Sequence, residues 1–132
     1  MHKLDITEFR VALTTDDFER AVKFYRDGLG LDPGDLWTDN GRGQIFWAGR
    51  AALEIFNPEY AAGVDQIEVG EQVSGQIRFA FEVEDVQVAM ERALKYGAVL
   101  VHEPVLTPWK DLNVRLQSPE GLQITLFQAN NE

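Results

Sequence analysis

The chain repeats itself, and this repeat limits what it can fold into more than any other feature of the sequence. The segment Arg10–Val22 matches Arg78–Met90 at a constant offset of 68 residues, with arginine on arginine at the first position. A later segment, Leu53–Phe56, matches Ile124–Phe127 at an offset of 71 residues. The small change in offset is what a difference in loop length between two copies produces. The sequence therefore predicts two copies of one supersecondary unit.

Each copy has the pattern of a strand, a helix and then shorter strands. Alternating apolar residues over Phe9–Leu13 and Ile77–Val83 predict half-buried strands. An aspartate N-cap precedes each helix, Asp16 or Asp17 in the first copy and Asp85 in the second. Further strands are expected at 45–47, 52–56, 99–101, 112–116 and 123–127, and Trp37 lies in another. This order is the βαβββ unit, and two such units in tandem predict an α+β fold.

We expect one domain over residues 1–132, with module 1 at about 5–58, a linker at about 59–75 and module 2 at about 76–128. The linker is expected to be a loop through Gly63, Gly70 and Gly75. Its carboxylates Asp65, Glu68 and Glu71 are expected to form a solvated face. Because one helix per module cannot cover two separate cores, the sheets must pack together or pair with another chain.

Composition excludes several classes of function. The net charge is −10, which argues against binding to nucleic acid or to an anionic membrane surface. The absence of cysteine excludes disulfides, thiolate nucleophiles and cysteine-based zinc sites, and it suits a cytoplasmic location. Charged residues run through 1–30, so no signal peptide is expected, and no apolar run is long enough for a membrane span.

Two stretches carry a resemblance to a known family. One runs from Val11 through Asp17-Phe-Glu-Arg-Ala-Val-Lys-Phe-Tyr to Leu29-Gly30, and the other holds Thr107-Pro-Trp109 and Ser118-Pro-Glu-Gly-Leu-Gln-Ile-Thr-Leu-Phe127. The chain resembles the vicinal oxygen chelate superfamily, which includes glyoxalase I, extradiol dioxygenases and bleomycin-resistance proteins. The resemblance implies a U-shaped mixed sheet around a cavity, helices on its outer face and, in a chain this short, a homodimer. It leaves the function open, because the fold hosts lyases, dioxygenases, epimerases and non-enzymatic binders.

The resemblance also implies four strand positions that hold a divalent metal in enzymes of the family, usually as His, Gln or Glu. In this sequence those positions are Arg10, Glu54, Arg78 and Thr125. Only Glu54 suits the role, because arginine has no acceptor and stays protonated. We therefore expect no bound metal, no other cofactor and no chemistry that depends on a metal.

Strand alternation predicts which side chains face the cavity. If the apolar residues of Phe9–Leu13 pack on the helix, Arg10 and the residues of equal parity in the other strands face the opposite side. The expected ligand-binding residues are Arg10, Trp47, Glu54, Phe56, Arg78, Trp109, Arg115, Thr125 and Phe127. For Trp47 and Trp109 the alternative is ordinary packing in the core or at a dimer interface. His102 is expected in a surface loop, and His2 near the mobile terminus.

The charges predicted for the cavity allow two interpretations. Arg10, Arg78 and Arg115 exceed Glu54 and Glu82 by one charge, so a carboxylate or phosphate could bind an arginine through two hydrogen bonds. Alternatively, Arg10 pairs with Glu54 and Arg78 with Glu82, and the two pairs close the cavity.

Three functions follow from these observations. The first is a metal-independent small-molecule-binding protein, whose antibiotic-like, anionic or carbonyl ligand lies in the cleft of a homodimer. The second is an enzyme, either a metal-dependent lyase, isomerase or dioxygenase with non-standard ligands, or a metal-free enzyme with Glu54 or Glu82 as base. The third is a structural or regulatory partner domain with a filled cavity. We favour the first, assign no residue to catalysis, and retain Glu54 as the candidate base.

Overall fold

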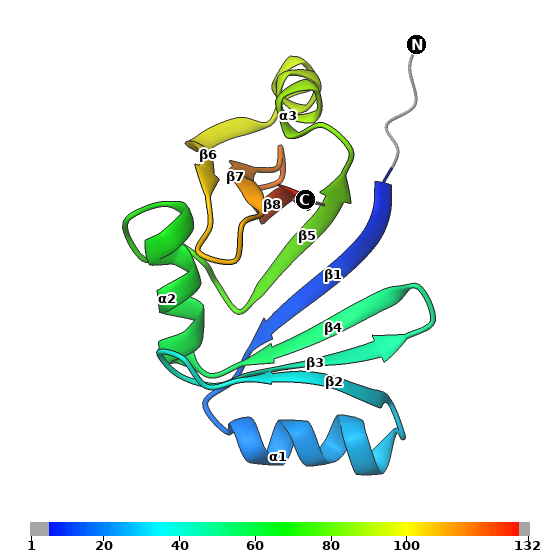
Figure 1. The fold of residues 1–132 in the computed structure, drawn as a ribbon. Helices are drawn as coiled ribbons and strands as arrows, with labels where there is room; N and C mark the ends of the chain where they lie inside the picture. The colour runs from blue at the N-terminus through cyan, green and yellow to red at the C-terminus, as the bar shows by residue number, and fades with distance from the viewer. Residues whose placement is uncertain (1–5, 130–132) are drawn as a thin grey trace.

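The computed structural model describes residues 6–129, which form an eight-stranded mixed sheet in the order β2-β3-β4-β1-β5-β8-β7-β6 (Figure 1). At its centre β1 (Ile6–Thr14) is antiparallel to β5 (Ile77–Val83). On one side β1 is parallel to β4 (Ala51–Phe56), and on the other β5 is parallel to β8 (Gln123–Gln128). The same order runs outward from the centre in both directions, which confirms the predicted α+β fold built from two copies of one unit.

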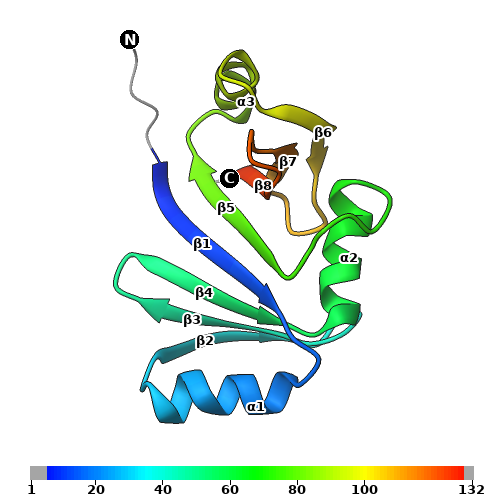
Figure 2. The ribbon, with the colours of Figure 1, turned by 180° about the vertical axis from the view of Figure 1, so that it is seen from behind.

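The outer strands complete each half by antiparallel pairing. In module 1, β3 (Gly43–Ala48) pairs with β4 and with the edge strand β2 (Asp32–Trp37). In module 2, β7 (Leu112–Gln117) pairs with β8 and with the edge strand β6 (Val99–Leu106). The sheet is open, and the view from behind shows its two halves diverging from the central β1–β5 pair (Figure 2). His102 lies on β6 with an exposed side chain, so the prediction of a loop position was wrong.

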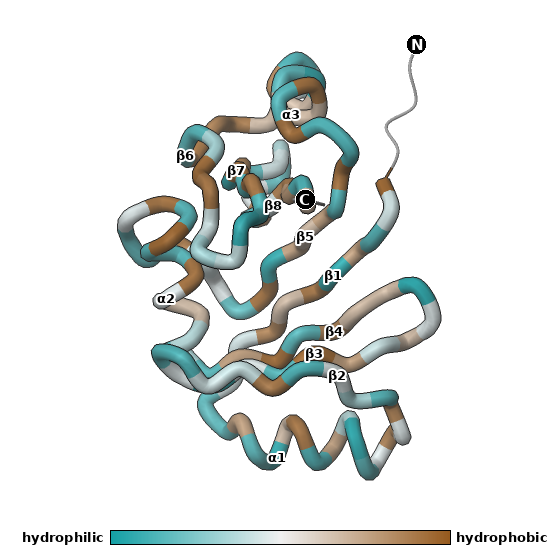
Figure 3. Tube along the Cα trace, viewed as in Figure 1, coloured by the Kyte–Doolittle hydropathy of each residue, from teal (hydrophilic) through white to brown (hydrophobic). Residues whose placement is uncertain are grey.

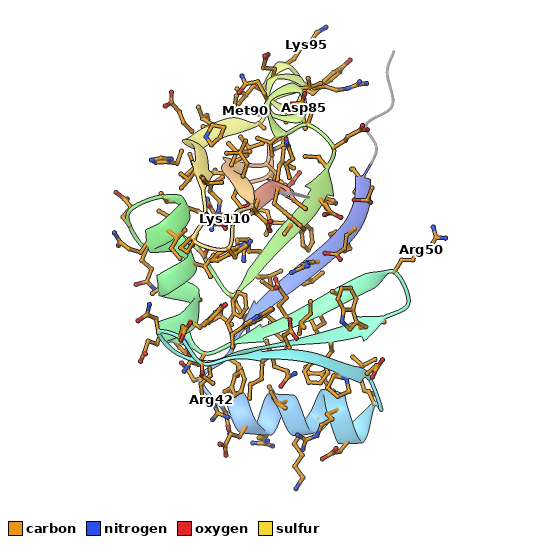
Figure 4. All side chains as sticks on the ribbon, in the orientation of Figure 1. Arg42, Arg50, Asp85, Met90, Lys95 and Lys110 are labelled. Carbon is orange, nitrogen blue, oxygen red and sulfur yellow. The ribbon has the colours of Figure 1, made fainter. Side chains whose placement is uncertain are left out.

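Aspartate caps start the helix of each module, as the sequence predicts. The carboxylate of Asp17 accepts a backbone hydrogen bond at the start of α1 (Phe18–Lys23), which continues as the π-helical turn η1 (Phe24–Gly28). The carboxylate of Asp85 accepts two such bonds at the start of α3 (Val86–Lys95), where Figure 4 labels it. These bonds satisfy backbone N–H groups that have no partner inside the helix.

Each of these helices buries its apolar side against the outer face of its own half of the sheet. The apolar and polar residues alternate along the strands, as the hydropathy colours show (Figure 3). The core under α1 contains Phe18, Val22, Phe46 and Ile55. The core under α3 contains Val83, Val86, Ala89, Met90, Val114, Leu116 and Leu126. The sheet thus keeps its opposite face, here called the inner face, free of α1 and α3.

The linker between the modules contains a third helix, so the prediction of a loop was wrong. Helix α2 runs over Pro58–Glu68 and starts at Asn57, whose side chain accepts the backbone N–H of Tyr60. Figures 1 and 2 both show it beside the sheet, reaching from the end of β4 to module 2. Asp65 and Glu68 are three residues apart and lie on one side of the helix. Both are buried, so the predicted solvated face was also wrong.

The predictions for His2 and the first charged residues fall on residues 1–5, outside the described residues. In the part of the chain that the structure describes, no helix is long and apolar enough to cross a membrane.

Candidate functional site

The register of the strands brings most of the predicted ligand-binding residues to the inner face. Arg10 lies opposite Ala52 and Ala80 in the neighbouring strands, and Thr125 lies opposite Ala80 and Arg115. The predicted residues on this face are Arg10, Trp47, Glu54, Phe56, Arg78, Arg115, Thr125 and Phe127. Trp109 lies apart from them, half exposed in the turn between β6 and β7.

Arg115 anchors α2 to the module 2 half of the inner face. The guanidinium has no exposed surface. Its Nη1 lies 2.9 Å from Oδ1 of Asp65, and its Nη2 lies 2.9 Å from Oε1 of Glu68. Nη1 also donates to Oγ of Ser74 at 3.0 Å and to Oε1 of Gln123 at 3.3 Å. Arg115 is therefore neutralised by two carboxylates of its own chain, although its Nη2 forms no hydrogen bond with the described residues.

The surroundings of Asp65 favour the ionised form of its carboxyl. Burial alone would raise the pKa of this carboxyl. Hydrogen bonds from the side chain and backbone of Ser74 and from the backbone of Val73, together with the charge of Arg115, outweigh burial and hold the pKa of Asp65 below its ordinary value. Asp65 is thus ionised at neutral pH and balances the buried arginine.

The two carboxylates of α2 also change the charge of the inner face. Counting strand residues alone gave an excess of one positive charge. Asp65 and Glu68 turn this into an excess of negative charge, so the predicted positive excess was wrong. The reason is that strand alternation reports only what the sheet itself contributes.

Glu54 and Arg10 form the centre of the module 1 half. Nη1 of Arg10 donates to Oε2 of Glu54 at 3.4 Å, and its Nε pairs with the carboxylate of Glu8. The Arg10 guanidinium lies over the ring of Phe127, 5.2 Å from the ring centre. The Arg10 side chain is 26% exposed and that of Glu54 only 8%. This part of the inner face therefore combines a buried carboxyl with a cation that reaches solvent.

Burial and neighbouring charges together shift the pKa values of Glu54 and Arg10. Loss of water raises the pKa of Glu54, and the opposing charges of Arg78 and Arg10 only partly offset the effect. Burial alone would lower the pKa of Arg10, but Glu54 and Glu8 outweigh it and raise that pKa further. A carboxyl with a raised pKa beside a permanent cation can accept or donate a proton nearer neutral pH than a solvated glutamate.

Arg78 is the third charged group of the inner face, and its partner differs from the predicted one. Nη1 of Arg78 donates to Oγ1 of Thr125 at 2.7 Å. Glu82 instead accepts a hydrogen bond from Thr7 at 2.6 Å, so the predicted Arg78–Glu82 pair was wrong. Residues four apart on one strand share a face but lie ~13 Å apart along it. Among residues 6–129, no other hydrogen bond and no ion pair of Arg78 is found.

Aromatic side chains close the end of the inner face beneath α2. Phe56 contacts Tyr60 of α2 with ring centres 4.8 Å apart, and Trp37 stacks on Tyr60 at 5.9 Å. Burial, with a smaller contribution from Glu54, raises the pKa of Tyr60 to about 12, so the phenol stays neutral. Trp47 lies half-buried on β3, away from this cluster.

A small cavity of about 10 Å³ lies between α2 and the sheet, with room for about one water molecule. It is lined by Ala12, Thr14, Phe56, Ala61, Val64, Ser74, Gly75 and Arg78. Arg78 thus lines this cavity and also donates the hydrogen bond to Thr125.

Comparison with known proteins identifies the fold. A model of the Glyoxalase/Bleomycin resistance protein/Dioxygenase superfamily matches residues 9–126. The chain belongs to this superfamily. No protein in a search of curated proteins matches it.

Solved structures share the superfamily architecture at low sequence identity. A superfamily member from Vibrio splendidus 12B01 is 15% identical, with 96% of this chain and 100% of that chain covered and a TM-score of 0.66. The methylmalonyl-CoA epimerase from Mycobacterium tuberculosis is 16% identical, with 98% and 93% covered and a TM-score of 0.70. A methylmalonyl-CoA epimerase in complex with methylmalonyl-CoA and NH4+ is 18% identical, with 98% and 97% covered and a TM-score of 0.69. At these identities the likeness shows the fold.

The side chains at the four positions where the superfamily resemblance implies metal ligands bind each other. Arg10 pairs with Glu54, and Arg78 donates to Thr125. Two guanidinium groups supply only N–H donors and would repel a cation. Across residues 6–129, no three His, Asp or Glu side chains converge in a way that could hold a metal ion. The donor set of this superfamily member does not fit a divalent metal.

Sequence reasoning missed the contribution of α2, namely Tyr60, Asp65 and Glu68. A signal for this helix was present in the sequence. Asn57-Pro58-Glu59 has an N-cap residue, a proline at the first helical position and an acid in the first turn, which is typical of a helix start.

Proposed function

We propose that this superfamily member is a metal-independent small-molecule-binding protein whose ligand lies on the inner face beside Arg10, Glu54 and Arg78. The observation that carries the proposal is the shortage of hydrogen-bond partners around the buried Arg78 side chain. Arg78 is 7% exposed and holds a permanent charge, yet it makes one hydrogen bond to a neutral hydroxyl. Glu54 is near enough for its pKa to feel the charge of Arg78, but the two side chains form no ion pair, and a buried charge that is not directly paired is costly. A ligand carboxylate, phosphate or carbonyl would supply the missing acceptors.

The surroundings of Arg78 suit a ligand that is anionic or carbonyl-bearing at one end and apolar at the other. Trp47 offers half-buried aromatic surface on the same face, and Arg10, which lies over the ring of Phe127, adds a second cation that reaches solvent. Pockets for small molecules combine apolar walls with a few placed polar groups in this way. An antibiotic-like ligand also fits these surroundings, because its charged or carbonyl groups would bind the same arginines.

The proposal of metal independence is supported by the donor chemistry at the four implied ligand positions. Its test is elemental analysis of protein purified without a metal-affinity tag. We expect nickel, zinc, iron and manganese far below one atom per chain. One equivalent of any of these metals would overturn metal independence and favour a metal-dependent lyase, isomerase or dioxygenase.

A second copy of the chain is proposed to complete the cleft. Apolar side chains on β6 and the turn after it support this, because Leu106 is 62% exposed and Val99 and Trp109 are about half exposed. Light scattering coupled to size exclusion is expected to give twice the mass of one chain. A monomer at micromolar concentration would leave the inner face to act alone.

Ligand binding is tested by following tryptophan fluorescence during titration with bleomycin, malonate and pyruvate. The variant Arg78→Gln removes the charge on the inner face. The matched control is Arg50→Gln, because Arg50 projects from the turn between β3 and β4 (Figure 4). Loss of a charge-assisted bidentate contact is expected to weaken binding of a responding probe by about 10–150-fold, with no change for the control. Equal affinities of R78Q and the native chain would contradict the proposal.

A second candidate function is metal-free proton transfer, and Glu54 favours it. Its carboxyl is buried, its pKa is raised by loss of water, and Arg10 lies beside it. A base of this kind removes a proton next to a carbonyl, and an adjacent cation stabilises the resulting enolate. Incubation of carbonyl compounds in D₂O would show deuterium at that carbon by NMR. Incorporation that disappears in Glu54→Gln would establish it, and no incorporation would leave binding as the function.

A further inference from the structure

A chain of hydrogen bonds leads from the linker helix to Arg78. Thr125 Oγ1 accepts from Nη1 of Arg78 at 2.7 Å and donates to Oε1 of Glu68, also at 2.7 Å. All three side chains are more than nine-tenths buried. A hydroxyl has one hydrogen, and here that hydrogen is committed to Glu68. The lone pairs of Oγ1 are therefore turned toward Arg78.

Glu68 is itself fixed from two further directions. Its Oε2 accepts from Nδ2 of Asn113 at 3.1 Å, and its Oε1 accepts from Nε of Arg115 at 3.1 Å. The carboxylate therefore has no freedom to leave Thr125. A long side chain such as that of Arg78, with a single hydrogen bond, would otherwise sample several rotamers. The fixed hydroxyl of Thr125 holds the Arg78 side chain in one orientation.

The bond at Nη1 decides which edge of the guanidinium stays available. Nε–H and one N–H of Nη2 point the same way and form the side of the group that binds two oxygens at once. No hydrogen bond of either atom is found within residues 6–129. A planar group with two acceptor oxygens, such as a carboxylate, matches this free edge.

We infer that Glu68 and Thr125 are positioning residues for Arg78, which hold its Nη1 so that the Nε and Nη2 edge is presented to a ligand carboxylate. The inference deepens the proposed function by naming the ligand group. It also makes α2, the linker between the modules, a part of the binding site although it need not touch the ligand. The positioning itself can be observed in the ligand-free protein, so it can be tested even if no ligand is found.

The first experiment records the guanidinium signals of uniformly ¹⁵N-labelled, ligand-free protein by NMR. Thr125→Val keeps the shape of the side chain and removes the hydroxyl, and Thr125→Ser restores the hydroxyl. The control is Thr107→Val, because Thr107 is also buried but its hydroxyl bonds to the backbone of Asp111. The Arg78 signal is assigned by its loss in Arg78→Lys.

We expect slow rotation about the Nε–Cζ bond of Arg78 in the native chain, T125S and T107V, and fast averaging in T125V. The Arg115 signal serves as an internal check, because its ion pairs remain in every variant and its rotation stays slow only while the fold is intact. Unchanged Arg78 rotation in T125V with Arg115 intact would overturn the inference. Failure of T125S to restore slow rotation would overturn it too.

If T125V does not fold, Thr125→Ser against Thr125→Ala gives the same comparison, since both are smaller than threonine and differ in the hydroxyl. The second readout is malonate affinity. We expect T125V to bind about tenfold more weakly or worse, and T125S to return close to the native value. If malonate does not bind the native chain while the NMR result holds, the ligand class fails and the positioning stands. If malonate binds equally to both, the positioning fails and the proposed function stands.

Discussion

Replacing Arg115 by methionine tests whether buried charge holds α2 to module 2. The substitution keeps an unbranched side chain but leaves Asp65 and Glu68 buried without the guanidinium that contacts both at 2.9 Å. Removing one partner of a buried ion pair costs about 3–5 kcal/mol. With a urea m-value near ~2 kcal/mol/M, the midpoint of unfolding should fall by about 2 M. Far-UV circular dichroism across a urea series measures this shift.

Two further variants separate charge from packing. The combined variant Asp65→Asn, Glu68→Gln and Arg115→Met removes all three charges, and we expect it to recover much of the lost stability. Arg26→Met removes an exposed pair with Asp27 and should leave the midpoint unchanged. A midpoint shift below about 0.5 M for R115M would refute the reasoning. So would a combined variant that is no more stable than R115M.

The same network predicts a dependence on pH. The pKa of Asp65 is lower in the folded protein than its ordinary value of 3.8, so its contribution to stability is present above that value and is lost as the pH falls through the folded pKa. In R115M the carboxyl of Asp65 loses the positive charge of Arg115, which favours its ionised form. The stability gap between the native chain and R115M should therefore narrow below about pH 4. A gap that stays constant down to pH 3 would contradict the assignment of Asp65.

Three further predictions concern separate parts of the fold. Asp85→Ala removes the cap of α3 and should cost about 1 kcal/mol by urea unfolding, while exposed Glu84→Ala should cost nothing measurable. Gly41→Ala should lower the melting temperature more than Gly49→Ala, because both have positive φ but only at Gly41 would a Cβ clash, with the Tyr60 backbone. Glu54→Gln should raise the urea midpoint at pH 7 but not at pH 4. The reason is that a carboxyl whose pKa is higher in the folded than in the unfolded chain destabilises the fold once the pH exceeds its unfolded pKa. Equal changes of the midpoint at both pH values would refute the raised pKa of Glu54.

The fold could be predicted from the sequence where local patterns repeat. Apolar alternation placed the central strands, and Asp17 and Asp85 marked the helix starts. The edge strand β6 was predicted too short, because Pro104 interrupts its pattern. Proline is tolerated there since an edge strand leaves one row of N–H groups unpaired.

The site could be predicted only in part, because alternation assigns a face but no distance. It placed Arg10 and Glu54 together correctly, since they lie on neighbouring strands. It paired Arg78 with Glu82 incorrectly, since they lie on the same strand. The role of α2 escaped because its buried positions include Asp65 and Glu68, and buried carboxylates cannot be told from solvated ones by hydropathy.

The ion pairs of Arg115 also determine when α2 can bind module 2 while the chain is being synthesised. Glu68 precedes Arg115 by 47 residues, which a ribosome adds in about 2–9 s at ~5–20 residues per second. During that time the strands of module 1 can already pair, but the carboxylates of α2 have no counter-charge and stay hydrated. The acidic end of α2 can dock on module 2 only after β7 is made. Phe56, Tyr60 and Trp37 can already pack together during that interval, so the surface that waits for β7 is the charged end of α2 and not its aromatic end.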